Sequence, residues 1–125
     1  MSNLDVLSEF HRAREEYRLN ADKAVQHGEF RKASELIWGA LTQQLKALAA
    51  TTGVTINRHG EFFTFVRELA NEIRNPEFYT RFVELNALHR NFYDEIIPPD
   101  TFPQFYERAL EYIAELETLT KRQLE

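Results

Sequence analysis

The chain has 125 residues, no cysteine and a net charge of −5 at pH 7. This length predicts a single domain, residues 1–125, that can bury a hydrophobic core, and the lack of cysteine excludes disulfides, thiolate metal ligands and a cysteine nucleophile. The polar N-terminal residues and the short apolar runs exclude a secretory signal and a membrane-spanning helix, so we expect a cytoplasmic protein with no membrane contact.

Apolar residues recur at steps of three and four along most of the chain, and most glycines and prolines fall at the breaks. This pattern predicts about five helices and no strand. The first is expected over residues 4–27, before Gly28, and the second over residues 29 to about 50–52, before Gly53. The second helix has a wide stripe expected in the core: Ala33, Ile37, Leu41, Leu45 and Leu48. Gly39 in its middle costs about 1 kcal/mol relative to alanine, which indicates that another helix approaches closely there.

The third and fourth helices are expected over residues 61–74 and 76–97. The third has an inward stripe made of Phe62, Val66, Leu69 and Ile73. The fourth has a strong start signal, with Asn75 as the N-cap and Pro76 at the first helical position, and the two prolines of IIPP end it.

The fifth helix is expected to run from Thr101 to the end of the chain, and Thr101 and Gln104 predict a capping box at its start. The loops between these long amphipathic helices are short, which makes neighbouring helices antiparallel. The predicted fold is therefore an all-α up-and-down bundle of about five antiparallel helices.

The segment LHRNFYDE, residues 88–95, carries the strongest candidate for chemistry. His89 lies in the expected core stripe of the fourth helix, which consists of Phe78, Phe82, Leu85, His89, Phe92 and Ile96, and Asn86 and Tyr93 lie on the same side. One reading is a buried neutral histidine bonded to these neighbours or to another helix. The other is a general acid/base or substrate ligand in a cleft, oriented by Tyr93. Arg90 and Asn91 point away from the stripe and are expected to be solvated.

The segment SELIWGALTQQLKAL in the second helix is a second candidate. Glu35, Trp38 and Thr42 lie on one side of this helix, and Gln44 borders its core stripe. Trp38 is either a core aromatic residue or the wall of a pocket.

Arg58 and His59 form a third candidate. If the third helix begins near Asn57, both lie at its positive end, where an anion can bind; otherwise they are an exposed loop tip. A single histidine without a carboxylate at ligand spacing makes a poor metal site. The chain also has no P-loop, no Rossmann fingerprint and no HExxH motif. We therefore expect no metal and no cofactor.

Three segments carry a resemblance to a known family: GEFRKASELIWGALTQQLKALA (28–49), RHGEFFTFVRELA (58–70) and ALHRNFYDE (87–95). They resemble the HEPN-type helical bundles, and within that superfamily the archaeal PaREP-like branch. The resemblance covers most of the chain, and it implies a short bundle that is often dimeric. Many HEPN domains are RNases with a composite site built from an Arg-x(4–6)-His motif on each protomer. Others are inactive partners of small nucleotidyltransferases in toxin–antitoxin pairs, or bind RNA or nucleotides.

The resemblance makes His89 the counterpart of the catalytic histidine. The nearest upstream arginine is Arg81, which is separated from it by seven residues and so misses the motif spacing. An eight-residue step on a helix still leaves the two about 80° apart, so they could converge across a dimer interface. His59, Arg90 and Asn91 match polar positions of the PaREP-like pattern.

Three functions are suggested as hypotheses. The first is a non-enzymatic interaction or nucleotide/RNA-binding module that acts as a homodimer or with a nucleotidyltransferase-type partner; the acidic balance of the chain argues against a freestanding nucleic-acid binder without excluding one. The second is an RNase with His89 as acid/base, Arg81 or Arg90 at the phosphate, and Asn86 and Tyr93 orienting. The third, suggested by the repeated GEF, is a peptide-binding helical hairpin. Trp38, Arg58, His59 and Asn91 complete the candidate site residues.

Overall fold

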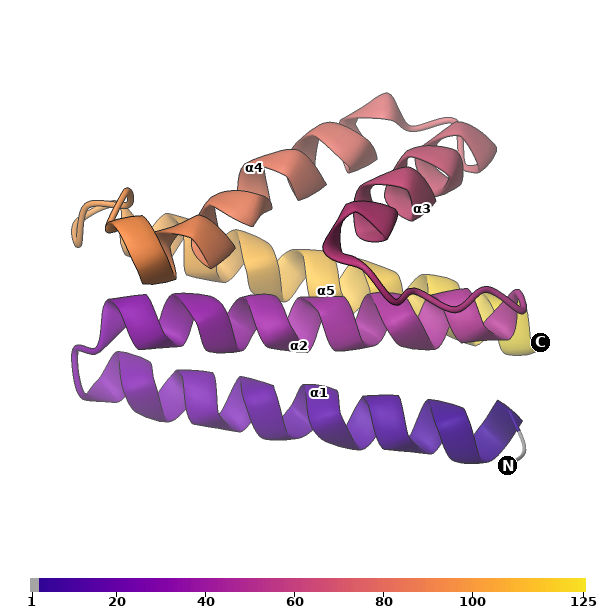
Figure 1. The fold of residues 1–125 in the computed structure, drawn as a ribbon, viewed down its shortest axis with the longest axis horizontal. Helices are drawn as coiled ribbons and strands as arrows, with labels where there is room; N and C mark the ends of the chain where they lie inside the picture. Colours follow the sequence, from indigo (N-terminus) through magenta and orange to yellow (C-terminus); the bar gives the residue numbers. More distant parts are fainter. Residues whose placement is uncertain (1–2) are drawn as a thin grey trace.

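The computed structural model describes residues 3–125 and contains no strand in that range. It has five helices (Figure 1): α1 (Asn3–Gln26), α2 (Phe30–Thr51), α3 (His59–Glu72), α4 (Pro76–Asp94) and α5 (Phe102–Leu124). The predicted all-α bundle is confirmed, and each predicted helix is present with its ends shifted by three residues at most. None of the helices within residues 3–125 is long and apolar enough to cross a membrane.

Helix α2 is the centre of the bundle and contacts the other four helices. Helices α1 and α5 lie along it, and α3 and α4 form a hairpin over its remaining face (Figure 1). Twelve of the 22 residues of α2 are buried, including the whole predicted stripe from Ala33 to Leu48. Its many alanine side chains let neighbouring helices approach closely, and this explains its central place.

Chain direction departs from a simple up-and-down order. Helices α1 and α2 are antiparallel, as are α4 and α5, but α2 and α5 are neighbours that run the same way (Figure 1). The reason is the segment of residues 52–58, which doubles back along α2 before α3 begins. This return carries the start of α3 back over the middle of α2.

The close approach predicted at Gly39 is confirmed. A Cβ built on Gly39 would lie 2.9 Å from Cδ1 and 3.1 Å from Cγ of Tyr17 in α1. The ring of Tyr17 therefore occupies the space that a side chain would need, and α1 and α2 pack closely at this level.

Several predicted helix ends are corrected. Helix α3 begins at His59, because the Arg58 N–H donates to Oε1 of Glu61 over 3.0 Å and closes the first turn early. The predicted capping box of α5 is absent. Thr101 has αR backbone angles, φ −94° and ψ −22°, and its hydroxyl contacts Asp100 instead of the helix. Asn75 precedes α4 but makes no side-chain cap hydrogen bond.

The inward stripes of α3 and α4 also end earlier than predicted. Ile73 is 37% exposed because it lies at the C-cap of α3, beyond the last packed turn. In α4 the buried face runs through Phe78, Phe82 and Leu85 as expected, and then continues through Leu88 and Asn91. Phe92 and Ile96, predicted inside, are 37% and 40% exposed, because α4 ends at Asp94 and Glu95 turns into a left-handed conformation, φ 50°.

Candidate functional site

His89 of α4 is paired with Glu35 of α2. Nδ1 of the histidine lies 2.8 Å from Oε1 of the glutamate, and the two side chains are 31% and 29% exposed. The histidine therefore lies at the rim of the bundle, and its partner comes from another helix rather than from Asn86 or Tyr93. A carboxylate acceptor holds the proton of a neutral imidazole on Nδ1. The second ring nitrogen, Nε2, has no hydrogen-bond partner among the described residues and can accept a hydrogen bond.

Four aromatic rings from three helices meet around this pair, and we call Trp38, His59, His89 and Tyr93 the ring cluster. The ring centroid of His89 lies 4.9 Å from that of His59, 6.0 Å from that of Trp38 and 5.7 Å from that of Tyr93. His59 lies 6.0 Å from Trp38. Three separate candidates from the sequence, in α2, at the start of α3 and in α4, thus form one site.

The ring cluster has a buried floor and an open roof. Trp38 is 3% exposed and packs on Phe82 with a centroid distance of 5.2 Å, so it is a core residue. His59 is exposed and rests against Phe63 at 5.5 Å, and Tyr93 is 64% exposed. The predicted role of Trp38 as a core aromatic residue is confirmed, and in the ring cluster it forms the buried floor beneath the other rings.

Two buried acceptor atoms in this region lack a donor. Oε2 of Glu35 and Oδ1 of Asn86 make no hydrogen bond within the described chain. Buried acceptors in proteins are nearly always satisfied by protein or by ordered water. Each of these two atoms can therefore accept a hydrogen bond from an ordered water.

Two unpaired cations flank the histidines along the chain. Arg58 precedes His59 and Arg90 follows His89, both are exposed, and neither side chain has an ion-pair partner within residues 3–125. The solvated position predicted for Arg90 is confirmed. Guanidinium groups next to imidazoles are suited to phosphate, because they offer several fixed donors at once.

Arg81 has a different role in the structure. Its guanidinium donates to both carboxylate oxygens of Glu115 in α5, over 2.6 and 3.1 Å, and lies 5.3 Å from the ring centroid of Tyr112. This hydrogen bonding raises the pKa of Arg81 above its usual value. Its described contacts join α4 to α5, and none of them reaches the ring cluster.

The prediction that Asn91 is solvated is wrong. Its side chain is 2% exposed, donates to the hydroxyl of Ser34 over 3.0 Å and accepts from the N–H of Ile97 over 2.7 Å. Asn91 thereby ties the end of α4 and the following loop to α2. Because Asn91 turns inward, the adjacent Phe92 turns outward.

Among the described residues, no group of three or more histidine, aspartate or glutamate side chains is arranged to hold a metal ion. The imidazoles of His59 and His89 and the carboxylate of Glu35 can serve as hydrogen-bonding and acid–base groups on their own account.

The residues that build the site lie in a part of the chain that matches a known protein family. A family model described as the archaeal PaREP1/PaREP8 family matches residues 10–116. The chain belongs to this family. The resemblance to PaREP-like proteins is confirmed, and the match includes every residue of the ring cluster. No curated protein matches the chain, and no solved structure matches it.

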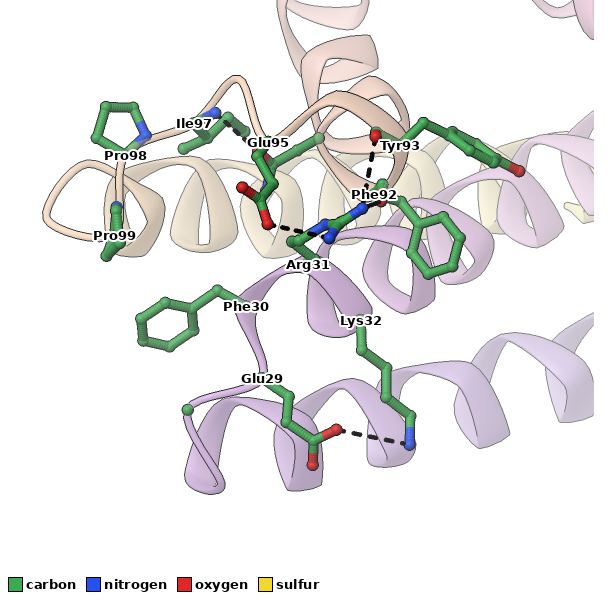
Figure 2. Close-up of a pocket in the computed structure, with 12 residues that line it drawn as sticks. Glu29, Phe30, Arg31, Lys32, Phe92, Tyr93, Glu95, Ile97, Pro98 and Pro99 are labelled. Carbon is green, nitrogen blue, oxygen red and sulfur yellow. Dashed lines mark hydrogen bonds and ion pairs between the residues drawn. The ribbon is translucent and has the colours of Figure 1, made fainter.

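Beside the ring cluster, this PaREP1/PaREP8 protein has a groove of about 790 Å³ between the α1–α2 turn and the α4–α5 segment (Figure 2). Arg31 lies in it and donates to the carbonyl of Phe92 over 2.6 and 3.0 Å, to that of Tyr93 over 3.4 Å and to Glu95 over 3.0 Å. These carbonyls end α4 and lack partners within the helix. Arg31 therefore caps α4 and fixes the position of Tyr93.

The sequence does not reveal two important relationships. Arg31 contacts a carbonyl 61 residues away, and nothing in the local segment GEFRK indicates this. The spacing of Glu35 from Trp38 places it on the correct face of α2, but no local signal indicates its pairing with His89, 54 residues away. In the PaREP1/PaREP8 protein both contacts depend on how α4 crosses α2.

Proposed function

We propose that this PaREP1/PaREP8 protein is a HEPN-like module that binds nucleotides or RNA without cleaving it, and that it acts as a homodimer or with a nucleotidyltransferase-type partner. The observation that carries the proposal is the ring cluster with its exposed side, together with an exposed arginine next to each of its two histidines in the chain. The order of helices and the resemblance of the three segments to HEPN domains support the same class.

Binding is expected from the chemistry of these groups. Stacking of a base on an aromatic ring contributes about 1–3 kcal/mol and tolerates any base. His59 and Tyr93 offer exposed ring faces and edges for this purpose. Arg58 and Arg90 are free to pair with phosphate oxygens, and Nε2 of His89 can bond to phosphate or to a sugar hydroxyl. The site thus provides partners for the base and for the phosphate of one nucleotide.

The motif of active HEPN RNases is missing. No arginine of the chain is followed by a histidine after four to six residues. Arg81, the nearest arginine upstream of His89, is committed to Glu115 in both of its terminal nitrogens. Binding without cleavage is therefore favoured over catalysis.

The single tryptophan of the chain makes a direct test possible, because Trp38 is the floor of the proposed site. We expect AMP and oligoadenylate to change the emission of Trp38, and His59→Ala and Arg58→Ala to weaken that binding about tenfold or more, as loss of a stacked ring or a phosphate contact should. Arg12→Ala, at an exposed position of α1, is the matched control and should bind like the wild type. Unchanged emission together with no heat in calorimetry at millimolar nucleotide would refute the proposal.

The homodimer is tested separately by light scattering across a range of protein concentrations. We expect a dimer that dissociates on dilution. If the protein is a monomer at every concentration, the homodimer is wrong, and a complex with a nucleotidyltransferase-type protein is the assembly left to test. Purification of that partner with a tagged chain from its source would then decide it.

The alternative function is an RNase with His89 as acid/base, and one observation favours it. Glu35 orients His89 with Nε2 open, and the ring centroid of His59 lies 4.9 Å from that of His89, so two imidazoles are available for acid–base chemistry. Cleavage of a mixed-sequence RNA should be compared for wild type, His89→Gln and His59→Ala, with melting curves for each. Cleavage lost in a stably folded His89→Gln variant would establish the RNase and exclude the non-enzymatic module.

A further inference from the structure

Tyr93 belongs to two features at once. Its ring packs edge-on against His89 with a centroid distance of 5.7 Å and an interplanar angle of 80°, and it also lines the groove. Figure 2 shows Tyr93 at the end of the groove opposite to Pro98 and Pro99. The ring cluster and the groove are therefore adjacent, because the exposed side chain of Tyr93 belongs to both.

We infer that the ring cluster and the groove are two adjoining subsites for consecutive nucleotides of a single-stranded RNA, with Tyr93 at the step between them. This inference rests on the proposed function, because the first subsite is the nucleotide site described above. It adds a second subsite, a path for the strand and a preference for unpaired RNA over a free nucleotide.

The groove has the size and the walls that a second nucleotide needs. Its volume of about 790 Å³ lies within the range of about 300–1,000 Å³ typical of small-molecule sites. Phe92, Pro98 and Pro99 line it with exposed apolar surface. Phe92 and Tyr93 contact each other edge-on at 5.0 Å, so two aromatic side chains border the path from one subsite to the other.

The charges of the groove indicate where a phosphate would bind. Arg31 is occupied by the end of α4 and by Glu95. Lys32 is 63% exposed, and its only ion pair within residues 3–125 is a long contact of 4.0 Å with Glu29. Lys32 lines the groove and can leave this weak contact at little cost, so it is the cation available for the phosphate of the second nucleotide.

The strand must be unpaired. Stacking on His59, Tyr93 and Phe92 requires the faces of the bases, which a duplex keeps inside its own stack. An RNA duplex would offer only phosphates and sugars to this surface, and the chain as a whole is acidic, with a net charge of −5. Single-stranded RNA is therefore the form that these side chains can recognise.

The test compares oligoadenylates of one, two, three and six nucleotides, all with a 5′-phosphate, using Trp38 emission and calorimetry. We expect affinity to rise about tenfold or more from AMP to the dinucleotide or trinucleotide and then to level off, since one further stacked base adds about this much. Tyr93→Ala and Lys32→Ala, both at exposed positions, should bring the ratio of hexamer to AMP affinity close to one. Arg12→Ala should keep the wild-type ratio, and six adenosines held paired in the stem of a stable RNA hairpin should bind no better than AMP.

The outcomes separate the inference from the proposed function. If AMP binds and length gives no gain, or if the duplex binds as tightly as the single strand, the second subsite is wrong and the nucleotide site stands. If neither AMP nor any oligonucleotide binds, both are wrong. If affinity rises with oligonucleotide length and Tyr93→Ala and Lys32→Ala do not reduce this rise, the second nucleotide binds elsewhere. This outcome would also overturn the inference.

Discussion

Glu35 of α2 and His89 of α4 are joined by a hydrogen bond of 2.8 Å between Oε1 and Nδ1, while Oε2 of Glu35 is buried without a partner. This pair is the only described link that orients the imidazole through a hydrogen bond. It also joins the hairpin of α3 and α4 to the central helix at the level of the ring cluster.

We predict that His89→Ala lowers the free energy of unfolding by about 1–2 kcal/mol, because it leaves both oxygens of Glu35 without a donor in a partly exposed site. In the double variant with Glu35→Ala the loss should be less than the sum of the two single losses. Denaturant melts of the four proteins measure this coupling. Tyr93→Ala is the control, because it removes a more exposed ring that contacts the same histidine and leaves the hydrogen bond to Glu35 in place. If the losses of the two single variants add up to the loss of the double variant, the pair contributes nothing to stability.

Asn91 stabilises the end of α4 through its hydrogen bonds to Ser34 and Ile97. Asn91→Leu is expected to lower the free energy of unfolding by about 1–3 kcal/mol, because the N–H of Ile97 loses its acceptor and stays buried. Arg90→Leu, one residue earlier and exposed, should change it by less than about 0.5 kcal/mol. Equal effects of the two substitutions in thermal melts would contradict the burial of Asn91.

Arg31 caps the C-terminal end of α4, so Arg31→Ala should lower the free energy of unfolding by about 1–2 kcal/mol. Arg31→Lys should restore only a minor part, since a single ammonium group cannot reproduce the fork that bonds to Phe92, Tyr93 and Glu95. Lys32→Ala is the neighbouring control. Hydrogen exchange should show earlier opening of the last turn of α4 in Arg31→Ala, and full rescue by lysine would mean that charge alone matters.

Replacing Gly39 with alanine has two opposing effects on stability, a clash with Tyr17 and a gain in helix propensity. In the wild type, Gly39→Ala brings a methyl group to 2.9 Å from the ring of Tyr17 and should be destabilising by about 1 kcal/mol or more. With Tyr17→Ala in place the clash is gone, and the same substitution should stabilise the protein by up to about 1 kcal/mol through helix propensity. A change of sign between the two backgrounds in denaturant melts is the expected result. If Gly39→Ala stabilises the protein in both backgrounds, α1 and α2 can move apart at this level without loss of stability.

His11 predicts a pH dependence of stability. It lies 3.5 Å from the buried side chain of Gln44, and burial and then the neighbouring Arg14 lower the pKa of His11, with Glu117 acting in the opposite direction. The unfolded chain therefore takes up a proton before the folded one does. The stability that this group contributes is complete above its unfolded pKa of about 6.5 and is lost as the pH falls through the folded pKa. Melts between pH 8 and pH 5 should show a smaller loss for His11→Gln, and equal slopes would contradict this.

The helices and the core face of α2 could be predicted because both are local properties of the chain. A repeat of three and four residues specifies a helix and one of its sides without reference to any other segment. The glycine after α1, the glycine after α2 and the Asn-Pro before α4 mark breaks in the same local way. The close approach at Gly39 could be inferred as well, since a glycine in the middle of a helix needs a neighbour to compensate for it.

The pairings that make the site required the tertiary structure. Along α4, His89 and Phe92 are adjacent to Leu88 and Asn91, and one residue step turns a helix by about 100°. The angle at which α4 crosses α2 decides which of each pair turns inward, and no local pattern encodes that angle. The same crossing brings His89 to Glu35 over 54 residues and Arg31 to Phe92 over 61. The sequence by itself thus determined which residues could carry chemistry, and the packing of α3 and α4 on α2 decided that the rings of Trp38, His59, His89 and Tyr93 come together.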